Sequence, residues 1–135
     1  WGRPDMAYFD FMKRILEKRE VTLFNNGELA RDMTYIDDIV DGILSAITFA
    51  EKSERYHEIF NLGNSAPVKT KYLLQLIQDK LKVNAQIKHI NNPNEVKITF
   101  ADCSKSNELL NYDPKVNVEE GMDNFFDWFR SYYEL

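Results

Sequence analysis

Apolar residues recur at helical spacing in five stretches of the chain. The pattern predicts helices over about residues 5–18, 36–51, 71–82, 104–110 and 118–133. The second stretch is the most regular, with Asp37 and Asp38 near the positive end of its dipole. Asp5 is the expected N-cap of the first helix, and Asn111 is expected to close the fourth because asparagine tolerates left-handed backbone.

Three shorter stretches have the composition of strands. We expect strands at Val21–Phe24, at 57–62 and at 86–90, each followed by polar or glycine-containing turns. Asn25, Asn26 and Gly27 favour positive φ, which predicts a hairpin after the first strand. The expected fold class is α/β, with short strands and about five helices. The 135 residues contain no repeats or linkers, so we expect 1–135 to be a single unit.

Composition excludes several classes of function. With 44% hydrophobic residues the chain can form a core, and its net charge of −5 has the wrong sign for nucleic-acid binding. No apolar run approaches the roughly 20 residues that span a bilayer, so we expect no membrane association and a cytoplasmic location. The one cysteine, Cys103, cannot form an internal disulfide, and with His57 and His89 it makes a poor zinc site. We therefore expect no metal.

The residues for a self-sufficient active site are also missing from the sequence. The 5 glycines are scattered, so neither a G-x-G-x-x-G nor a Walker A loop can be drawn. No tyrosine is followed four residues later by a lysine, and no G-x-S-x-G occurs. We therefore expect no catalytic and no cofactor-binding residue in this chain.

The run from Arg31 to Asp38, R-D-M-T-Y-I-D-D, resembles the R-D-[FYW]-x-[YH]-[VI]-x-D motif of the extended short-chain dehydrogenase/reductases. The opening W-G-R-P-D-M-A is similar to a segment of the UDP-glucuronate 4-epimerases within that family. Further matches, in the same order as in the family, are N-L-G at 61–63, A-D-C-S-K at 101–105, L-N-Y-D-P at 110–114 and W-F-R-S-Y-Y at 128–133. The resemblance therefore extends over the whole chain.

The resemblance implies an NAD-dependent nucleotide-sugar epimerase, an isomerase of polysaccharide biosynthesis that inverts C4 of UDP-glucuronate through a 4-keto sugar. In that family NAD and the catalytic tyrosine and lysine belong to an N-terminal dinucleotide-binding lobe. The chain would then be the C-terminal substrate-binding part, inactive alone and without that lobe. A dehydratase or decarboxylase of the same family and a non-catalytic α/β interaction module are the alternatives.

The resemblance also implies four substrate-binding residues. Arg31 would contact the UDP diphosphate, where a planar guanidinium serves two oxygens, and Arg3 would face the uronate carboxylate. Phe24 would flank the uracil, although a strand aromatic is as readily a core residue. Glu95 stands where the family keeps an acid near the ribose, but the usual G-D-x-P is here Asn94-Glu95-Val96-Lys97.

The resemblance implies a homodimeric parent protein as well. In the family, the helix at 36–51 and the strand at 58–62 belong to the nucleotide-binding sheet. We therefore expect 36–62 to pack on the missing lobe. Without that lobe, these elements should expose apolar faces, and the isolated chain should self-associate.

Overall fold

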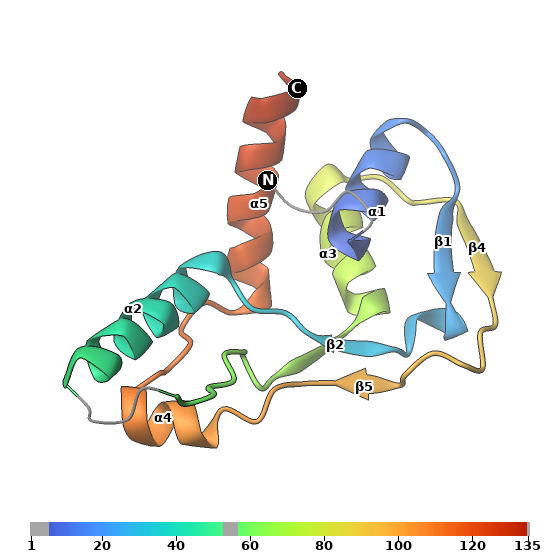
Figure 1. Ribbon diagram of the computed structural model, residues 1–135. Coiled ribbons are helices and arrows are strands. Elements are labelled where there is room, and N and C mark those ends of the chain that lie inside the picture. Colours follow the sequence, from blue (N-terminus) through green and yellow to red (C-terminus); the bar gives the residue numbers. More distant parts are fainter. Residues whose placement is uncertain (1–5, 53–56, 135) are drawn as a thin grey trace. The chain divides into compact units, whose positions relative to one another are not determined.

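The computed structural model describes residues 6–52 and 57–134 (Figure 1). Within these residues there are five α-helices, five short strands and one 3-10 turn. The helices are α1 (Ala7–Leu16), α2 (Ile36–Lys52), α3 (Thr70–Leu81), α4 (Ser104–Leu110) and α5 (Val118–Tyr133). The strands are β1 (Val21–Phe24), β2 (Ala30–Asp32), β3 (Pro67–Lys69), β4 (Ile87–Ile90) and β5 (Ile98–Thr99), and η1 is Asn25–Gly27. The predicted helices and the α/β class are confirmed.

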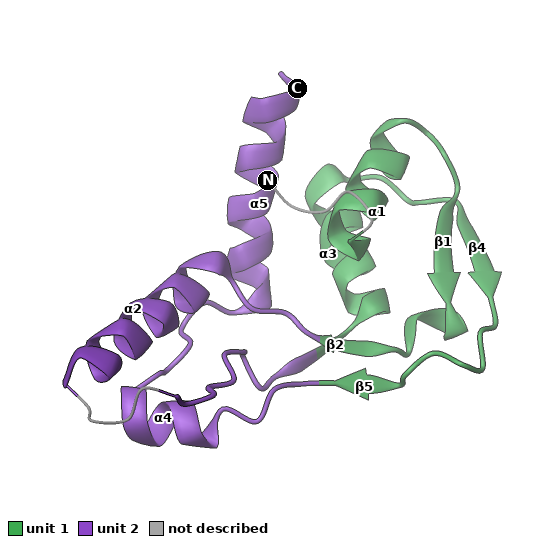
Figure 2. Cartoon of the chain, viewed as in Figure 1, with its two compact units in different colours: residues 1–31, 68–99 green, residues 32–67, 100–135 purple. Residues whose placement is uncertain are grey.

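The chain divides into two compact units, coloured separately in Figure 2. Unit 1 comprises Trp1–Arg31 and Val68–Thr99, and unit 2 comprises Asp32–Pro67 and Phe100–Leu135. Each unit is built from two stretches of chain, so no single cut in the sequence separates them. The expectation that the 135 residues form a single unit stays a prediction.

Unit 1 is organised by the parallel pairing of β1 with β4, in register from Val21–Ile87 to Phe24–Ile90. Alternation along β1 buries Val21 and Leu23, as expected for a half-buried strand. The predicted hairpin is wrong, because β1 pairs with β4 and not with the strand that follows it. Asn25, Asn26 and Gly27 do have positive φ, but they form η1, which leads the chain out of this sheet.

Helices α1 and α3 pack together and supply most of the core of unit 1. Their inward faces bury Phe9, Phe11, Met12, Ile15, Leu73, Leu74 and Ile77. Leu16, placed by its spacing in the same stripe as Phe9 and Met12, is instead 40% exposed because α1 ends there. The predicted N-cap Asp5 lies outside the described residues, and Met6 occupies the N-cap position without a side-chain hydrogen bond.

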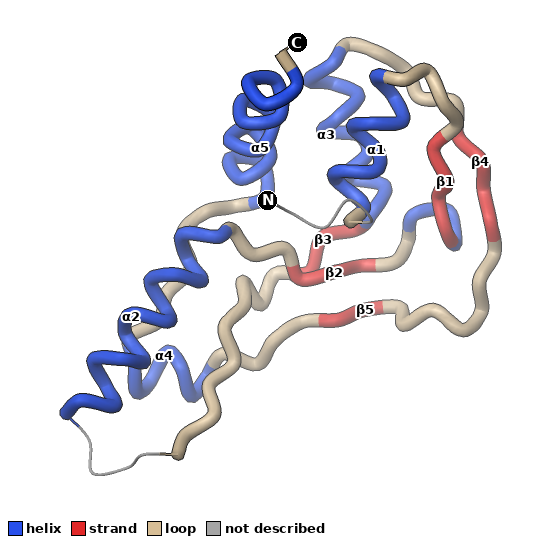
Figure 3. The backbone as a smooth tube through the Cα atoms, turned by 45° about the horizontal axis from the view of Figure 1, so that its top comes forward, coloured by secondary structure: helices blue, strands red, loops and turns tan. Residues whose placement is uncertain are grey.

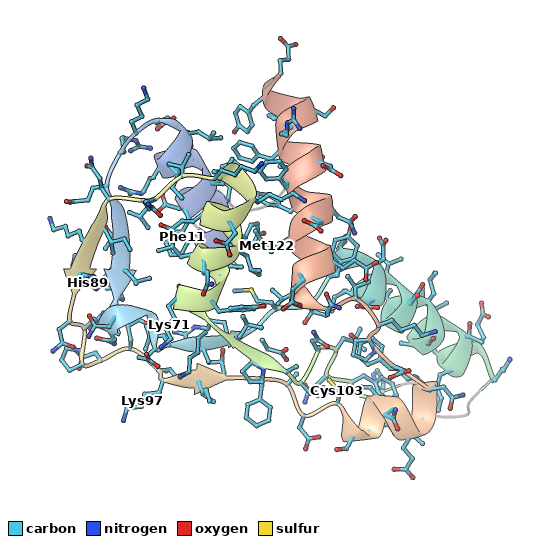
Figure 4. The ribbon with its side chains drawn as sticks, turned by 180° about the vertical axis from the view of Figure 1, so that it is seen from behind. Phe11, Lys71, His89, Lys97, Cys103 and Met122 are labelled. Carbon is cyan, nitrogen blue, oxygen red and sulfur yellow. The ribbon has the colours of Figure 1, made fainter. Side chains whose placement is uncertain are left out.

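A second sheet has the order β3-β2-β5 (Figure 3). Strands β2 and β5 run parallel, with Ala30 beside Ile98 and Arg31 beside Thr99. The Ala30 amide donates to the carbonyl of Lys97 over 2.8 Å, and this lysine leads into β5 (Figure 4). None of these three strands was expected from the sequence, because runs of two or three residues are too short to show a period of two.

Unit 2 contains α2, α4 and α5. Helix α2 contacts α4, and its inward face is marked by the buried residues Asp38 and Gly42. The predicted strand at 57–62 is wrong: none of the described strands includes these residues. They are held by side chains instead, because Ser106 Oγ donates to the Asn61 carbonyl and Lys105 Nζ donates to the Glu58 carboxylate over 2.7 Å.

The apolar stripe of α2 faces away from its contact with α4. Ile36, Val40, Ile43, Leu44 and Ile47 are between 43 and 60% exposed. The exposed apolar face predicted for this helix is therefore confirmed, while self-association stays a prediction. No helix within residues 6–52 and 57–134 is both long and apolar enough to cross a bilayer.

Candidate functional site

Arg31 lies on β2, and its side chain is 31% exposed. Nη1 donates to the carbonyls of Ala30 and Val96 over 2.9 and 2.8 Å, and Nη2 donates to Glu95 Oε2 over 3.1 Å. Among the described residues none accepts a hydrogen bond from Nε of this guanidinium. The structure therefore brings Arg31 and Glu95 together and leaves Arg31 with donors for a further acceptor.

Phe24 is the last residue of β1, and its side chain points out of the core. It is 41% exposed, whereas Leu23 before it is 4% exposed. Its partner across the parallel ladder is Ile90, the last residue of β4. Phe24 thus lies at the carboxyl end of β1, and the segment that carries Glu95 follows the carboxyl end of the neighbouring parallel strand β4. This edge is where α/β sheets commonly bind ligands. Arg3 lies outside the described residues.

The segments after these two strands are joined by a pair of hydrogen bonds. Asn25 Nδ2 donates to the Asn92 carbonyl over 2.9 Å, and the Asn92 amide donates back to Asn25 Oδ1 over 2.8 Å. Neither asparagine was predicted from the sequence as a site residue. The signal that could have found them is an asparagine directly after a strand together with the Asn-rich loop at 91–94.

Asp32, the neighbour of Arg31, has a different role. Its carboxylate accepts hydrogen bonds from the amides of Asn64, Ser65 and Ala101 at 3.2, 3.1 and 3.0 Å. Gly63 permits this approach, because an added Cβ would lie 2.7 Å from Asp32 Oδ2 and 2.6 Å from Ala101 Cβ. The second residue of the R-D motif therefore joins two other motif segments and is fully engaged within unit 2.

Two further motif residues, Cys103 and Tyr112, lie near each other in unit 2. Cys103, at the start of α4 in Figure 4, donates from Sγ to the Gly63 carbonyl over 3.5 Å. Tyr112 is 4% exposed, and its hydroxyl lies near the Gly63 backbone without a hydrogen bond of good geometry in the described chain. Burial raises the pKa of Tyr112 to about 12, with smaller contributions from Cys103 and Asp38. These groups are arranged for packing and not for nucleophilic chemistry.

Asp38, the last residue of the R-D motif, is buried and accepts from the amides of Lys115 and Val116 over 3.0 and 3.1 Å. The charge of this carboxylate is therefore used to fix the loop before α5. No group of three His, Cys, Asp or Glu side chains in the described parts of the chain could hold a metal ion. Of the four predicted substrate-binding residues, the structure describes Arg31, Glu95 and Phe24, which are partly exposed and belong to unit 1.

Sequence relatives match nearly the whole chain. A protein of Methanocaldococcus jannaschii described as uncharacterized is 50% identical, over 96% of this chain and 39% of its own length. UDP-glucuronate 4-epimerase 4 of Arabidopsis thaliana is 41% identical, over 98% of this chain and 34% of its own length. Residues 2–63 match the family model described as the NAD dependent epimerase/dehydratase family. The chain therefore resembles members of this family over nearly its whole length.

A solved structure extends the similarity from the sequence to the fold. The UDP-glucuronic acid 4-epimerase of Bacillus cereus, in complex with UDP-glucuronic acid and NAD, superposes with a TM-score of 0.84 at 30% identity. It covers 98% of this chain, and the chain covers 42% of it. The fold is that of the C-terminal part of Rossmann-type epimerases, and the predicted class is confirmed. The chain spans about two fifths of the length of these relatives.

Proposed function

We propose that the chain is the UDP-sugar-binding part of an NAD-dependent nucleotide-sugar epimerase that acts on UDP-glucuronate. The observation that carries the proposal is Arg31, half-buried on β2 and with Nε unengaged among the described residues. A guanidinium in this state can add charge-assisted hydrogen bonds to a diphosphate. Phe24, exposed at the end of β1, offers a ring for the uracil.

Glu95 has a double role in this proposal. One carboxylate oxygen, Oε2, accepts from Arg31, whereas none of the described residues donates to Oε1. Glu95 can therefore accept a hydrogen bond from a ribose hydroxyl while it keeps its contact with Arg31. Arg3 is proposed to face the uronate carboxylate, which would distinguish a uronic acid from a neutral hexose.

Two of the described glycines, Gly27 and Gly42, leave no room for NAD. A dinucleotide pyrophosphate needs glycines whose missing side chain leaves room for phosphate oxygens. In the described structure, an added Cβ would lie 2.6 Å from Lys71 Cβ at Gly27 and 2.7 Å from Leu62 Cδ2 at Gly42. Protein atoms thus fill the space that a phosphate would need. We therefore assign NAD, and with it the redox step, to the part of the full-length enzyme that corresponds to the rest of its longer relatives.

The part of the full-length enzyme to which we assign NAD is also the partner that we propose for the apolar face of α2. We propose that residues 36–62 pack on the nucleotide-binding part of the full-length enzyme, and that the chain studied alone self-associates through this face. Light scattering should then give a mass above 15.9 kDa that falls when Ile43→Lys interrupts the face. A monomer at high concentration would contradict self-association. A homodimeric parent and a cytoplasmic location stay predictions.

The nucleotide-binding proposal is tested by titrating the chain with UDP and with ADP. UDP should bind more tightly, and Arg31→Ala should lower its affinity at least about tenfold through loss of a charged hydrogen bond. Arg14→Ala is a matched control, because Arg14 has the same exposed fraction, 31%, and also pairs with a carboxylate, that of Asp10. Equal affinity for UDP and ADP would favour the non-catalytic interaction module, and an unchanged affinity in Arg31→Ala would contradict the diphosphate role.

A dehydratase or decarboxylase acting on a related nucleotide sugar is the alternative within the family, and it predicts the same UDP titration. The reaction is separated from binding by product analysis. Turnover of UDP-glucuronate by the full-length enzyme should give a C4 epimer of unchanged mass. Loss of water or of carbon dioxide would identify one of the alternatives.

A further inference from the structure

Asn25 and Asn92 hold the two segments of the candidate site together, although they are separated by 67 residues in the sequence. Asn25 has a φ of 48°, a left-handed backbone that asparagine adopts more readily than most residues. Its side-chain amide donates to the Asn92 carbonyl and accepts from the Asn92 amide, at 2.9 and 2.8 Å. Both hydrogen-bonding atoms of the Asn25 side chain are therefore committed to one residue of the opposite loop.

The two hydrogen bonds between Asn25 and Asn92, here called the bridge, are connected to Arg31 through the turn at 92–95. The Asn92 carbonyl also accepts from the Glu95 amide over 3.3 Å, and Asn92 Oδ1 accepts from the Asn94 amide over 3.2 Å. Glu95 Oε2 and the Val96 carbonyl then accept from the guanidinium of Arg31. A continuous series of hydrogen bonds thus leads from the side chain of Asn25 to the cation proposed to bind the diphosphate.

From this series we infer that Asn25 is a positioning residue for the diphosphate contact of Arg31. It fixes the turn at 92–95, and this turn fixes the two acceptors that orient the guanidinium. The inference rests on the proposed function, since it concerns the same site. Asn26 provides the comparison, because it has a similar φ of 55°, whereas the hydrogen bonds to Asn92 within the described residues come from Asn25.

The test is a titration of the chain and of its Asn25→Gly variant with UDP and with uridine. Glycine accepts a positive φ without strain, so the substitution removes the bridge while keeping the backbone of η1. We expect UDP affinity to fall about fivefold, the size expected for one or two neutral hydrogen bonds. Uridine affinity should stay unchanged, because uridine has no phosphate for Arg31. Asn26→Gly should leave both affinities unchanged.

A double-mutant cycle with Arg31→Ala tests whether Asn25→Gly lowers UDP affinity through Arg31. If Asn25 acts through Arg31, the double variant loses no more UDP affinity than Arg31→Ala alone. Additive losses, or an equal fall in uridine affinity, would overturn the inference. If Asn25→Gly does not fold, Asn25→Asp replaces it: this variant keeps the acceptor but opposes the Asn92 carbonyl with a charge, and an unchanged UDP affinity would overturn the inference. A normal UDP affinity in Arg31→Ala would instead contradict the proposed function itself.

Discussion

The guanidinium of Arg31 donates to the carboxylate of Glu95 over 3.1 Å, with the two side chains 31 and 39% exposed. A partly exposed ion pair of this kind is weak, because water screens the charges and the side chains lose entropy in forming it. Arg31 is therefore already paired with the Glu95 carboxylate, although we propose that it also binds the diphosphate of UDP. Binding of a diphosphate must add to this pair or replace it.

The first prediction concerns the charge of Glu95. Glu95→Gln keeps an oxygen that accepts from Arg31 but removes a negative charge next to the incoming phosphates. UDP affinity should rise about twofold to fivefold at low ionic strength, the range expected for a partly exposed charge interaction. The gain should shrink in 0.5 M salt, about where screening becomes strong, and titration calorimetry at two salt concentrations measures both effects.

Glu95→Ala is the control for that prediction, since it removes the acceptor together with the charge. Its UDP affinity should lie below that of Glu95→Gln, because Arg31 then loses a positioning partner. A fall in affinity in Glu95→Gln would contradict the charge argument and would favour a dominant contact between Glu95 and the ribose.

The second prediction tests the junction around Asp32. In Gly63→Ala the new methyl group would meet Ala101 Cβ at 2.6 Å and Asp32 Oδ2 at 2.7 Å. Ala101 Cβ is fixed to the backbone, and Asp32 Oδ2 is held by the amides of Ser65 and Ala101. We expect the free energy of unfolding to fall by about 2 kcal/mol or more, as for overpacked sites. Urea unfolding followed by circular dichroism measures the change.

Gly121→Ala is the matched control for Gly63→Ala. Its Cβ would lie 3.4 Å from Tyr35 Cδ2, an ordinary contact, and Gly121 lies within α5. Because alanine is favoured over glycine inside a helix, this variant should be more stable by about 0.5 to 1 kcal/mol. Equal destabilisation of both variants would show that the close approach at Gly63 is not what constrains that position.

Much of the fold could be predicted because the long helices repeat their apolar residues over several turns. Helices α2, α3 and α5 appeared at the expected positions, and so did β1, with its alternating burial. The errors arose where strand formation depends on pairing with a distant segment. The segment at 57–62 has the composition of a strand but pairs with none of the described strands, and β2 and β5 are strands only because they lie beside each other.

The candidate site was likewise predictable only in part. Arg31 could be found from its motif, and the family resemblance also pointed to Glu95 and Phe24. That Glu95 and Arg31 touch could not be predicted, because 64 residues separate them and the contact depends on the parallel pairing of β2 with β5. The motif also did not indicate that the carboxylates of Asp32 and Asp38 accept hydrogen bonds from backbone amides. Only the structure shows these hydrogen bonds.

The third prediction concerns the buried hydroxyl of Tyr112. Because this hydroxyl makes no hydrogen bond of good geometry in the described chain, Tyr112→Phe should leave the stability at pH 7 unchanged or slightly higher. Ser106→Ala is the contrasting variant: Ser106 is as deeply buried, but its hydroxyl donates to the Asn61 carbonyl, so its loss should cost about 1 to 2 kcal/mol. Thermal unfolding of the three proteins at pH 7 tests the difference.

The pKa of Tyr112 adds an alkaline test. Burial raises the pKa from 10.0 to about 12, so between these values the folded protein keeps a proton that the unfolded chain has lost. Stability must therefore decline as the pH rises from about 10 to about 12. Tyr112→Phe should decline less steeply than the parent over this range. Parallel pH profiles would contradict the raised pKa.

The fourth prediction is an acid dependence from Glu28. Its carboxylate accepts from Lys69 Nζ over 2.7 Å and from Lys71 Nζ, and these two hydrogen bonds lower its pKa from 4.5 to about 2. Because the folded pKa is depressed, the stabilisation is complete above about 4.5 and is lost as the pH falls toward about 2. Glu28→Gln should therefore melt slightly below the parent at pH 7 and together with it near pH 2. Glu20→Gln makes the same change of net charge without these lysine contacts. If it reproduced the whole effect, the loss would belong to net charge and not to the contacts of Glu28.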